Sequence, residues 1–551
     1  MKKENFIKLY EESFRINFIY PALTDYGTTT SYTYGELAKE IEKLHILFSK
    51  CNIQEGDKIA LVGKNTTQWC IAYLSIITYG AVVVPILQDF NSKDIHHIIN
   101  HSESMLLFIS DAIWVNVADG DLPLLRGAFS LNDWKVLYQK EGERIDELIP
   151  NLEALFQEKY PEGFGPQHIQ YIDVSNDKVR VLNYTSGTTG FSKGVMITGN
   201  NLSGNMTFAH VTFNLKQKDA MLSFLPLAHT YGAAFEFLYA LSEGTHVTLL
   251  GKTPSPKILV KAFEEVRPTL VIAVPLILEK IHKKMILPAL AKKNIRWALK
   301  ASFLRKLIYA QIHKKLLKAF GGNFKQIIIG GAPLNAEVED FLLKIHFPIS
   351  VGYGMTECAP LISFSLCKDY IPHSCGKILP CMEVRIDSED PYTLAGEIQV
   401  KGQNVMAGYY KNEEATRNAF TEDGWLRTGD LGTIDRNYNI FIRGRSKNMI
   451  LSASGQNIYP EEIENKLNNL PFVLESVVVD RKGRLIALVY PDYDALASEG
   501  VAQADLDKIM HQNKETLNHM VASYEKIAAI ELQPHEFEKT PKKSIKRFLY
   551  H

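Results

Sequence analysis

The alternation of helical and β-branched segments in the first half of the chain restricts the possible folds most strongly. Apolar residues recur at helical spacing over Tyr34–Cys51 and Thr67–Tyr79, while Lys58–Val62 and Ala81–Val84 have the composition of strands. Short connections between such segments are typical of a mostly parallel sheet covered by helices. The pattern continues with predicted strands at Ala220–Phe224, His246–Leu250, Leu270–Ala273 and Gln326–Ile329, and with predicted helices at Ala233–Ser242 and Ser255–Val266.

A second domain is indicated toward the end of the chain. With 551 residues, 46% of them hydrophobic and 22% charged, the chain can bury a large core and is expected to divide. The segments become short, glycine-punctuated strands after about residue 395, and a helix–strand–strand–helix pattern begins after Pro460. We place the boundary within Gly444–Lys447, which gives domains 1–445 and 446–551.

Net charge and cysteine content limit the kind of partner, the kind of site and the cellular compartment that the chain fits. The formal net charge of −1 argues against a nucleic-acid-binding protein and favours small-molecule partners. The six cysteines form no C-x-x-C pair, so neither a zinc site nor a disulfide framework is indicated, and a reducing cytoplasm fits best. The N-terminal segment predicts an amphipathic first helix and not a secretory signal. The apolar stretch Ile71–Leu87 contains Gly80 and Pro85, which favours a buried helix–turn–strand over a membrane span.

One segment, residues 280–325, is strongly basic although the whole chain is near neutral. Its cations are Lys280, Lys283, Lys284, Lys292, Lys293, Arg296, Lys300, Arg305, Lys306, Lys314, Lys315, Lys318 and Lys325, and Glu279 is the one acid beside them. Aromatic and aliphatic residues interleave with these cations at helical spacing. The segment therefore fits an anionic membrane surface or a phosphorylated ligand, and a solvated basic face is the structural alternative.

The segment YTSGTTGFSKG, Tyr184–Gly194, has the composition of a phosphate-binding loop. Its glycines allow the backbone to approach an anion, and Lys193 supplies a positive charge. Hydroxyl donors come from Thr185, Ser186, Thr188, Thr189 and Ser192. Predicted strands flank the loop, and Gly190 is separated from Lys193, so this is not a Walker A loop; an ordinary polar turn is the alternative.

Further glycine-rich clusters follow along the chain. The run Gly330–Pro333 comes after a predicted strand, where small residues let a flat base lie against the backbone. An aromatic, a hydroxyl and a carboxylate lie within Gly352–Glu357, and Asp430 lies in a tight turn, where it can accept two hydrogen bonds from a ribose diol. Cations gather at Arg443–Lys447.

Taken together, these motifs resemble the core motifs of adenylate-forming (AMP-binding) enzymes. The matching segments, in order, are YTSGTTGFSKG, LPLAHTYG (Leu225–Gly232), GYGMTE, GWLRTGD and Arg445–Glu464. Two stretches, from Trp297 to Gly331 and GEIQVKGQNVMAGYY (Gly396–Tyr410), look most like bacterial long-chain fatty acyl-CoA synthetases. The resemblance implies an α/β fold whose large N-terminal domain has mixed, mostly parallel sheets packed with helices and a small β-barrel-like subdomain. A small, mobile α+β C-terminal domain would follow.

The implied activity is a two-step ligation. ATP, with Mg²⁺, activates a fatty acid to an acyl-adenylate with release of pyrophosphate, and the acyl group then passes to coenzyme A. A cytoplasmic location is implied, with peripheral contact at the inner face of the membrane through residues 280–325. The sequence predicts nothing about oligomeric state or acyl chain length.

The resemblance also assigns roles to individual residues. Thr188 and Lys193 would hold the β- and γ-phosphates, Glu357 with Thr188 would bind Mg²⁺, and Thr356 would donate to the α-phosphate. His229 would lie at the carboxylate end of an acyl tunnel walled by the apolar helix after Gly232. The nucleotide-binding set is Thr185, Ser186, Gly187, Thr188, Thr189, Gly190, Lys193, Gly331, Ala332, Pro333, Tyr353, Gly354, Asp430 and Arg445, joined by Lys447 as the pivot of the C-terminal domain and Gly455 on its second face.

The sequence departs from this family near its C-terminus. Relatives carry a lysine that bridges the substrate carboxylate and the phosphate, and a gapless alignment puts Ser544 at that position. Lys543 is our candidate for the catalytic lysine, with Lys542 second. Two other functions stay open: acyl transfer to a carrier protein in place of CoA, and a weakened protein that binds an acyl-adenylate or nucleotide without efficient turnover.

Overall fold

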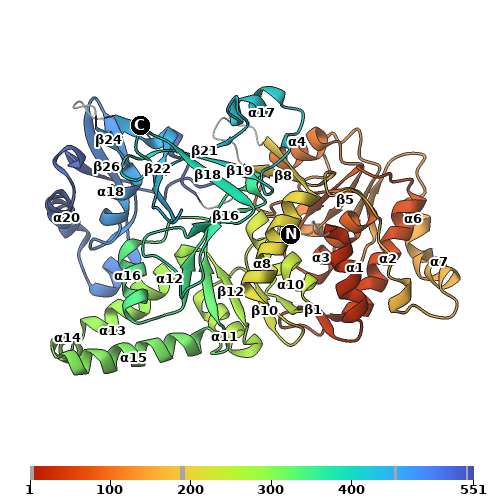
Figure 1. Cartoon of the computed structure of the whole chain (residues 1–551), viewed down its shortest axis with the longest axis horizontal. Coiled ribbons are helices and arrows are strands. Elements are labelled where there is room, and N and C mark those ends of the chain that lie inside the picture. The colour runs from red at the N-terminus through yellow and green to blue at the C-terminus, as the bar shows by residue number, and fades with distance from the viewer. Residues whose placement is uncertain (1–4, 186–192, 452–455, 541–543, 551) are drawn as a thin grey trace.

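The structure is a computed structural model that describes residues 5–185, 193–451, 456–540 and 544–550. Two large sheets with covering helices make up most of the molecule, and the C-terminal residues form a separate lobe at one end (Figure 1). This is the expected α/β architecture.

The first large sheet carries the predicted phosphate loop. Within the described residues its strand order is β20-β9-β8-β4-β3-β5-β6-β7, and the central pairs β4–β8, β3–β4, β3–β5 and β5–β6 are parallel. The strands are β3 (Lys58–Val62), β4 (Val82–Ile86), β5 (Leu106–Ile109), β6 (Gly127–Ser130), β7 (Val136–Gln139), β8 (Val179–Thr185), β9 (Lys193–Thr198) and β20 (Gly408–Tyr409).

The second large sheet carries the LPLAHTYG and Gly330–Pro333 motifs at its strand ends. Its order among the described residues is β14-β13-β12-β10-β11-β1-β2, parallel except for β1–β2. The strands are β1 (Pro21–Asp25), β2 (Ser31–Thr33), β10 (Ala220–Ser223), β11 (His246–Leu249), β12 (Leu270–Ala273), β13 (Gln326–Ile329) and β14 (Ile349–Val351).

The predicted helices form because both their ends and their apolar faces are specified locally. In α3 (Thr67–Tyr79), the Thr66 side chain accepts a hydrogen bond from Trp69 N at the start, and Gly80 ends the helix with φ of 100°. The segment Ile71–Leu87 is therefore a helix, a turn and a strand, as predicted. The other main helices are α1 (Phe6–Ile16), α2 (Tyr34–Lys50), α4 (Ser92–Ser102), α8 (Gly199–Phe213), α11 (Pro256–Val266), α16 (Ala336–Lys344) and α17 (Glu413–Ala419).

Antiparallel strands connect the sheets to the C-terminal lobe. In the part of the chain that the structure describes, β18 (Met382–Asp387), β19 (Gly396–Gly402), β21 (Leu426–Ile434) and β22 (Ile440–Arg445) form one sheet. A smaller sheet comprises β15 (Tyr353–Gly354), β16 (Leu361–Phe364) and β17 (Lys377–Ile378), and the bridge Lys377–Asn439 links the two. These two small sheets lie in the part of the chain where we expected the barrel-like subdomain.

The C-terminal lobe has its own hydrophobic cores. The large core runs from Phe6 to Ile440, whereas two smaller cores lie between Ile458 and Phe537. The predicted helix–strand–strand–helix pattern is present as α18 (Pro460–Leu467), β25 (Val473–Arg481), β26 (Arg484–Pro491) and α20 (Leu506–Met520), with β27 (Ala529–Leu532) parallel to β26. The boundary at 445/446 and the mobility of the lobe remain predictions.

The lobe touches the large domain through a few polar contacts. Lys283 Nζ lies 2.8 Å from Asp492 Oδ2, and the Asn335 side-chain amide donates to Asn469 Oδ1 at 2.8 Å. A search of the described helices finds none that is long and apolar enough to cross a membrane.

Candidate active site

The two ends of the predicted phosphate loop are held in an antiparallel pair. Strands β8 and β9 pair Thr185 with Lys193 and Tyr184 with Gly194, so the loop joins two strands, as predicted. A Cβ on Gly194 would lie 3.0 Å from the Tyr184 ring, a contact that is tight for any side chain larger than glycine. The predicted loop residues Ser186, Gly187, Thr188, Thr189 and Gly190 lie outside the described residues.

Tyr409 connects the phosphate loop to the predicted magnesium ligand. Strand β20 pairs with β9, which places the Lys193 ammonium 5.0 Å from the centre of the Tyr409 ring. The Tyr409 hydroxyl donates to Glu357 Oε1 at 2.9 Å, and burial raises the pKa of this tyrosine. Our sequence reasoning missed Tyr409, although it lies within the quoted segment GEIQVKGQNVMAGYY.

The segment GYGMTE is shaped by close backbone contacts. A Cβ on Gly354 would overlap the carbonyl oxygen of Pro360, so only glycine fits. Thr356 is buried at the start of a short 3₁₀ turn, Thr356–Cys358, which also carries Glu357. The Glu357 backbone carbonyl accepts from Met406 N at 2.8 Å, which further attaches this turn to the segment before β20.

The structure brings Tyr353, Asp430 and Arg445 into direct contact. The Tyr353 hydroxyl donates to Asp430 Oδ2 at 2.6 Å, and Arg445 Nε lies 2.8 Å from Asp430 Oδ1. Asp430 is 4% exposed, and this burial raises its pKa, while the Arg445 charge and the tyrosine hydrogen bond oppose the rise. The side chain of Arg445 is 57% exposed, so this ion pair is partly open to solvent.

Tyr231 joins the LPLAHTYG motif to the end of β13. Its hydroxyl donates to the carbonyl of Ile328 at 3.2 Å, and a Cβ on Gly330 would lie 3.0 Å from its ring. Gly331 follows with φ of 85°, a left-handed conformation that favours glycine. Gly331, Ala332 and Pro333 are exposed, so their backbone is accessible to a flat base.

Two asparagines hold the turn that precedes His229. The Asn65 side chain donates to the Leu225 carbonyl at 2.6 Å and accepts from Leu227 N at 3.0 Å. The Asn183 side chain, from β8, donates to the Ala228 carbonyl at 2.9 Å. His229 is half-buried at the N-terminus of α9 (Thr230–Gly232), directly after this turn. Neither asparagine stands out in the sequence, because each acts on a distant segment.

Glu236 is a buried carboxyl group behind this turn. It lies on the π-helix η3 (Ala233–Leu238), is fully buried, and accepts through Oε2 from Ser223 Oγ at 2.9 Å and from the backbone N–H groups of Phe224 and Leu225 at 3.1 Å. Its Oε1 has no hydrogen-bond partner among the described residues. Burial raises the pKa of Glu236 well above its ordinary value, which favours the neutral acid over the carboxylate.

We expect Glu236→Ala to lower the free energy of unfolding by about 3–6 kcal/mol, because two backbone N–H groups and one hydroxyl lose their acceptor. Glu236→Gln keeps an accepting oxygen and the side-chain shape, and is expected to cost about 1 kcal/mol or less at pH 5. Denaturant titrations of the three proteins measure both effects, and an equal loss in the Ala and Gln variants would contradict this role.

The raised pKa also predicts a pH dependence. As pH rises above the ordinary carboxyl value, the unfolded chain loses the Glu236 proton while the folded protein keeps it. This residue's contribution to the free energy of unfolding therefore falls with rising pH, so Glu236→Gln should gain stability relative to wild type between pH 5 and pH 8.

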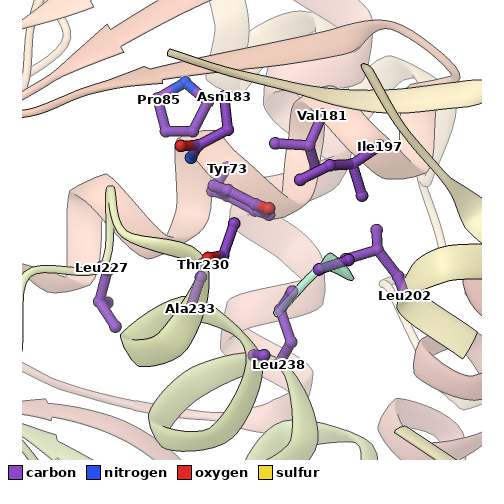
Figure 2. A pocket seen from close by; sticks show the side chains of 12 residues that line it. Tyr73, Pro85, Val181, Asn183, Ile197, Leu202, Leu227, Thr230, Ala233 and Leu238 are labelled. Carbon is purple, nitrogen blue, oxygen red and sulfur yellow. The ribbon is translucent and has the colours of Figure 1, made fainter. Parts of the chain in front are cut away.

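A small apolar cavity lies beside His229, against the helix that follows it. Figure 2 shows Thr230, Ala233 and Leu238 of this helix facing Tyr73, Val181, Ile197 and Leu202 across the cavity. Its free volume is about 10 Å³, room for about one water molecule. A longer ligand would therefore need the lining side chains to move apart. That the helix after Gly232 walls a tunnel for an acyl chain stays a prediction.

The predicted residues of the C-terminal lobe are only partly described. Lys447 lies exposed on a 3₁₀ turn, Ser446–Asn448, directly after β22. Gly455, Lys542 and Lys543 lie outside the described residues. Beyond them, Arg547 forms an ion pair with Glu464 of α18, and burial raises the pKa of Glu464 to about 7. This pair anchors the end of the chain to the lobe.

The donor set at Glu357 is compatible with Mg²⁺. Magnesium is usually held by one or two carboxylates together with substrate phosphates and waters, and not by a cage of protein ligands. Among the described residues no cluster of three or more His, Cys, Asp or Glu side chains could hold a metal ion by itself. Glu357 provides one carboxylate beside the phosphate loop, fixed by the Tyr409 hydroxyl, as such a site requires.

Comparison with known proteins agrees with this geometry. Residues 16–410 match the family described as AMP-binding enzyme. A long-chain-fatty-acid–CoA ligase, FadD15 of Mycobacterium bovis, is 30% identical over 96% of this chain and 92% of its own. ATP-bound MatB of Rhodopseudomonas palustris has a TM-score of 0.75 at 22% identity, covering 98% of both chains.

The Bacillus subtilis o-succinylbenzoate CoA synthetase MenE is a further structural relative. Its complexes with an acyl-adenylate intermediate and with ATP and a magnesium ion both give a TM-score of 0.73, at 21% and 20% identity, over 99% of this chain and 98% of theirs. The fold, the order of the motifs and the match over most of the chain lead to one conclusion: this protein belongs to the AMP-binding enzyme family.

Proposed function

We propose that the protein activates a long-chain fatty acid with ATP to an acyl-adenylate, releasing pyrophosphate, and then transfers the acyl group to coenzyme A, giving acyl-CoA and AMP. One observation carries this proposal: the segment Gly352–Glu357 joins two polar clusters suited to a nucleotide, through Tyr353 and Glu357, and Ala359 directly after it lines the apolar cavity. The name of the mycobacterial relative supports a fatty acid as the substrate.

The chemical problem is one of charge. A carboxylate must approach a triphosphate at its α-phosphorus, and the transition state gathers further negative charge, so fixed cations and donors are needed. Lys193 and the loop hydroxyls would hold the β- and γ-phosphates of the leaving group, and Thr356 would donate to the α-phosphate. Mg²⁺ held by Glu357, with the Thr188 hydroxyl, would supply charge at the phosphates.

The nucleoside would be held by the second cluster. Asp430 would accept from the ribose hydroxyls, since its carboxylate is already fixed by Tyr353 and Arg445. The exposed backbone of Gly331–Pro333 and the Tyr353 ring would flank adenine. Rotation of the C-terminal lobe about Lys447 would present Lys543 for the first step and the face with Gly455 for the second.

The proposal also covers the length of the acyl chain and the cellular location of the protein. A long acyl chain would extend along the helix after Gly232, whose side chains line the apolar cavity. Because such substrates partition into membranes, we propose a cytoplasmic enzyme that makes peripheral contact with the inner face of the membrane through residues 280–325.

The direct test is a panel of saturated fatty acids of graded length, with ATP and either CoA or acyl carrier protein as acceptor. We expect AMP and CoA thioester to form together and to increase with chain length into the long-chain range. If the thioester forms only on the carrier protein, the acceptor is the carrier protein and not CoA. AMP formation with short acids only would contradict the long-chain preference.

A second candidate function follows from Ser544, which stands where relatives have lysine. A protein that binds ATP and fatty acid without efficient adenylation would show nucleotide binding in calorimetry but no fatty-acid-dependent exchange of pyrophosphate into ATP. That combination of results would exclude the enzyme reading.

A further inference from the structure

The connection between β12 and β13 forms a projecting arm. It comprises α12 (Pro275–Ile281), the π-helix η4 (His282–Ile286), α13 (Leu287–Ala291), α14 (Lys293–Ala298) and α15 (Ser302–Ala319). In Figure 1 α15 runs along the lower edge of the molecule, α13 and α14 lie at its left end, and α12 lies farther in. We call residues 285–307 the arm tip.

The base of the arm, together with Ile286 where the tip begins, is packed on the domain, whereas no residue from 291 to 307 is buried. From Tyr309 onward in α15, Leu316 is buried, the Tyr309 and Phe341 ring centroids lie 6.0 Å apart, and His313 Nδ1 lies 2.9 Å from the Ile345 carbonyl. From Ser302 to Leu307, by contrast, every residue of the helix is exposed. A helix turn exposed on all sides has no packing partner for its apolar residues within the described part of the chain.

Large apolar side chains gather on the arm tip. Trp297 is 78% exposed and Phe303 is 71% exposed, and the other exposed apolar residues here are Met285, Leu287, Leu304 and Leu307. Exposed aromatic and aliphatic residues are normal singly, but a group of this size on one projection marks an interaction surface.

The cations of the arm tip identify the kind of partner. Lys292, Lys293, Arg296, Lys300, Arg305 and Lys306 are exposed, and none of them forms an ion pair with any residue that the structure describes. The sequence contains no Asp or Glu from residue 280 to residue 336. A second copy of the chain, docked through the same surface, would bring these cations against their own equivalents. The charge therefore favours an anionic surface over self-association.

We propose that the arm tip is a membrane-docking element that inserts Trp297 and Phe303 into an anionic phospholipid bilayer while its lysines and arginines contact the lipid phosphates. Apolar residues flanked by cations are the composition of helices that lie in the membrane interface. The inference rests on the proposed function, because a bilayer is where a long-chain fatty acid is concentrated.

The arm also leads directly to the candidate active site. The Ala273 carbonyl at its start accepts from Gly330 N at 3.1 Å, and the Tyr231 hydroxyl lies 3.5 Å from the same carbonyl. The arm therefore begins at the strand ends where the acyl motif and the Gly330–Pro333 motif meet, and it ends at the opposite edge of the sheet, where Lys325 N donates to the Thr269 carbonyl. A docked tip would hold this edge of the enzyme close to the lipid.

Vesicle flotation of the full-length protein tests the proposal. We expect binding to phosphatidylcholine vesicles to increase about tenfold or more when about a third of the lipid is phosphatidylglycerol, and to weaken with salt. The variant Lys292→Gln, Lys293→Gln, Lys300→Gln should lose about tenfold or more of this binding. The control Lys50→Gln, Lys508→Gln, Lys526→Gln removes the same charge from exposed sites elsewhere and should bind nearly as wild type.

A second variant, Trp297→Ser with Phe303→Ser, separates insertion from charge attraction and should weaken binding at high salt most strongly. Equal loss in the tip and control lysine variants, or no wild-type binding to anionic vesicles, would overturn the proposal. Tip-dependent dimers in sedimentation velocity without lipid would instead assign the surface to self-association.

Activity provides the independent readout. The tip variants should keep wild-type turnover of a medium-chain acid that is dissolved in water, and lose turnover of a long-chain acid supplied in anionic vesicles. Vesicle binding without turnover of any fatty acid would contradict the proposed function and leave the docking element intact.

Discussion

Replacing Asp430 by Asn is expected to raise the KM for ATP by about tenfold to a hundredfold, which corresponds to the loss of one or two charge-assisted hydrogen bonds of about 1.5–3 kcal/mol. The Asp430 carboxylate accepts from Tyr353 and pairs with Arg445 while it is almost fully buried. The amide of asparagine would present N–H donors to groups that are themselves donors, so both the local contacts and the ribose contacts would suffer.

Isothermal titration of ATP into the two proteins measures the binding part of this effect. Asp423→Asn provides a matched control, because Asp423 pairs with Arg385 at 2.5 Å on the exposed surface of the same antiparallel region. We expect the control to bind ATP within about twofold of wild type, as exposed ion pairs contribute little. If Asp430→Asn binds ATP as tightly as its control, Asp430 does not hold the ribose.

Replacing Lys543 by Ala is expected to slow the adenylation half-reaction by about a hundredfold or more, since a fixed charge that bridges the carboxylate and the phosphate would be lost. Acyl transfer from preformed acyl-adenylate to CoA should change much less, because the proposed function assigns that step to another face of the C-terminal lobe. Lys543 lies outside the described residues, but its neighbours are anchored: Thr540 N donates to the Ser544 carbonyl at 2.8 Å, and Arg547 pairs with Glu464.

Lys542→Ala is the natural comparison, as it removes the same side chain one residue earlier. The burst of pyrophosphate release measures the rate of the first half-reaction. Acyl transfer from synthetic acyl-adenylate to CoA measures the rate of the second. If Lys542→Ala slows the first step more than Lys543→Ala does, Lys542 takes the place of Lys543 as the catalytic lysine. Equal losses in both half-reactions for Lys543→Ala would contradict a role confined to adenylation.

The secondary structure was predictable where short-range signals agree. Helix α3 is an example, because an apolar periodicity, the Thr66 cap and Gly80 all lie within fifteen residues of one another in the sequence. Strands β3, β12 and β13 were likewise found at their predicted bounds. The π-helical geometry of η3 was not predicted, since the pattern at Ala233–Ser242 indicates helix without its hydrogen-bond register.

The partners of the site residues were much less predictable. Glu357 was recognised from its motif, but its contact with Tyr409 exists only because β20 pairs with β9 across the sheet. In the sequence, Glu236 is an ordinary polar residue of a predicted helix. Only the fold shows that it is buried against the end of β10. Such contacts join segments distant in sequence, so no local pattern encodes them.

The sequence by itself determined the α/β class, most helix and strand positions, and the motifs that mark the family, because capping, periodicity and motif composition are local properties. Only the tertiary structure decided what each of those residues touches: Asp430 with Tyr353 and Arg445, Lys193 over Tyr409, and the arm tip with its exposed Trp297. The physical reason is that packing and strand pairing act between distant segments, and burial and ion pairing follow from where those segments meet.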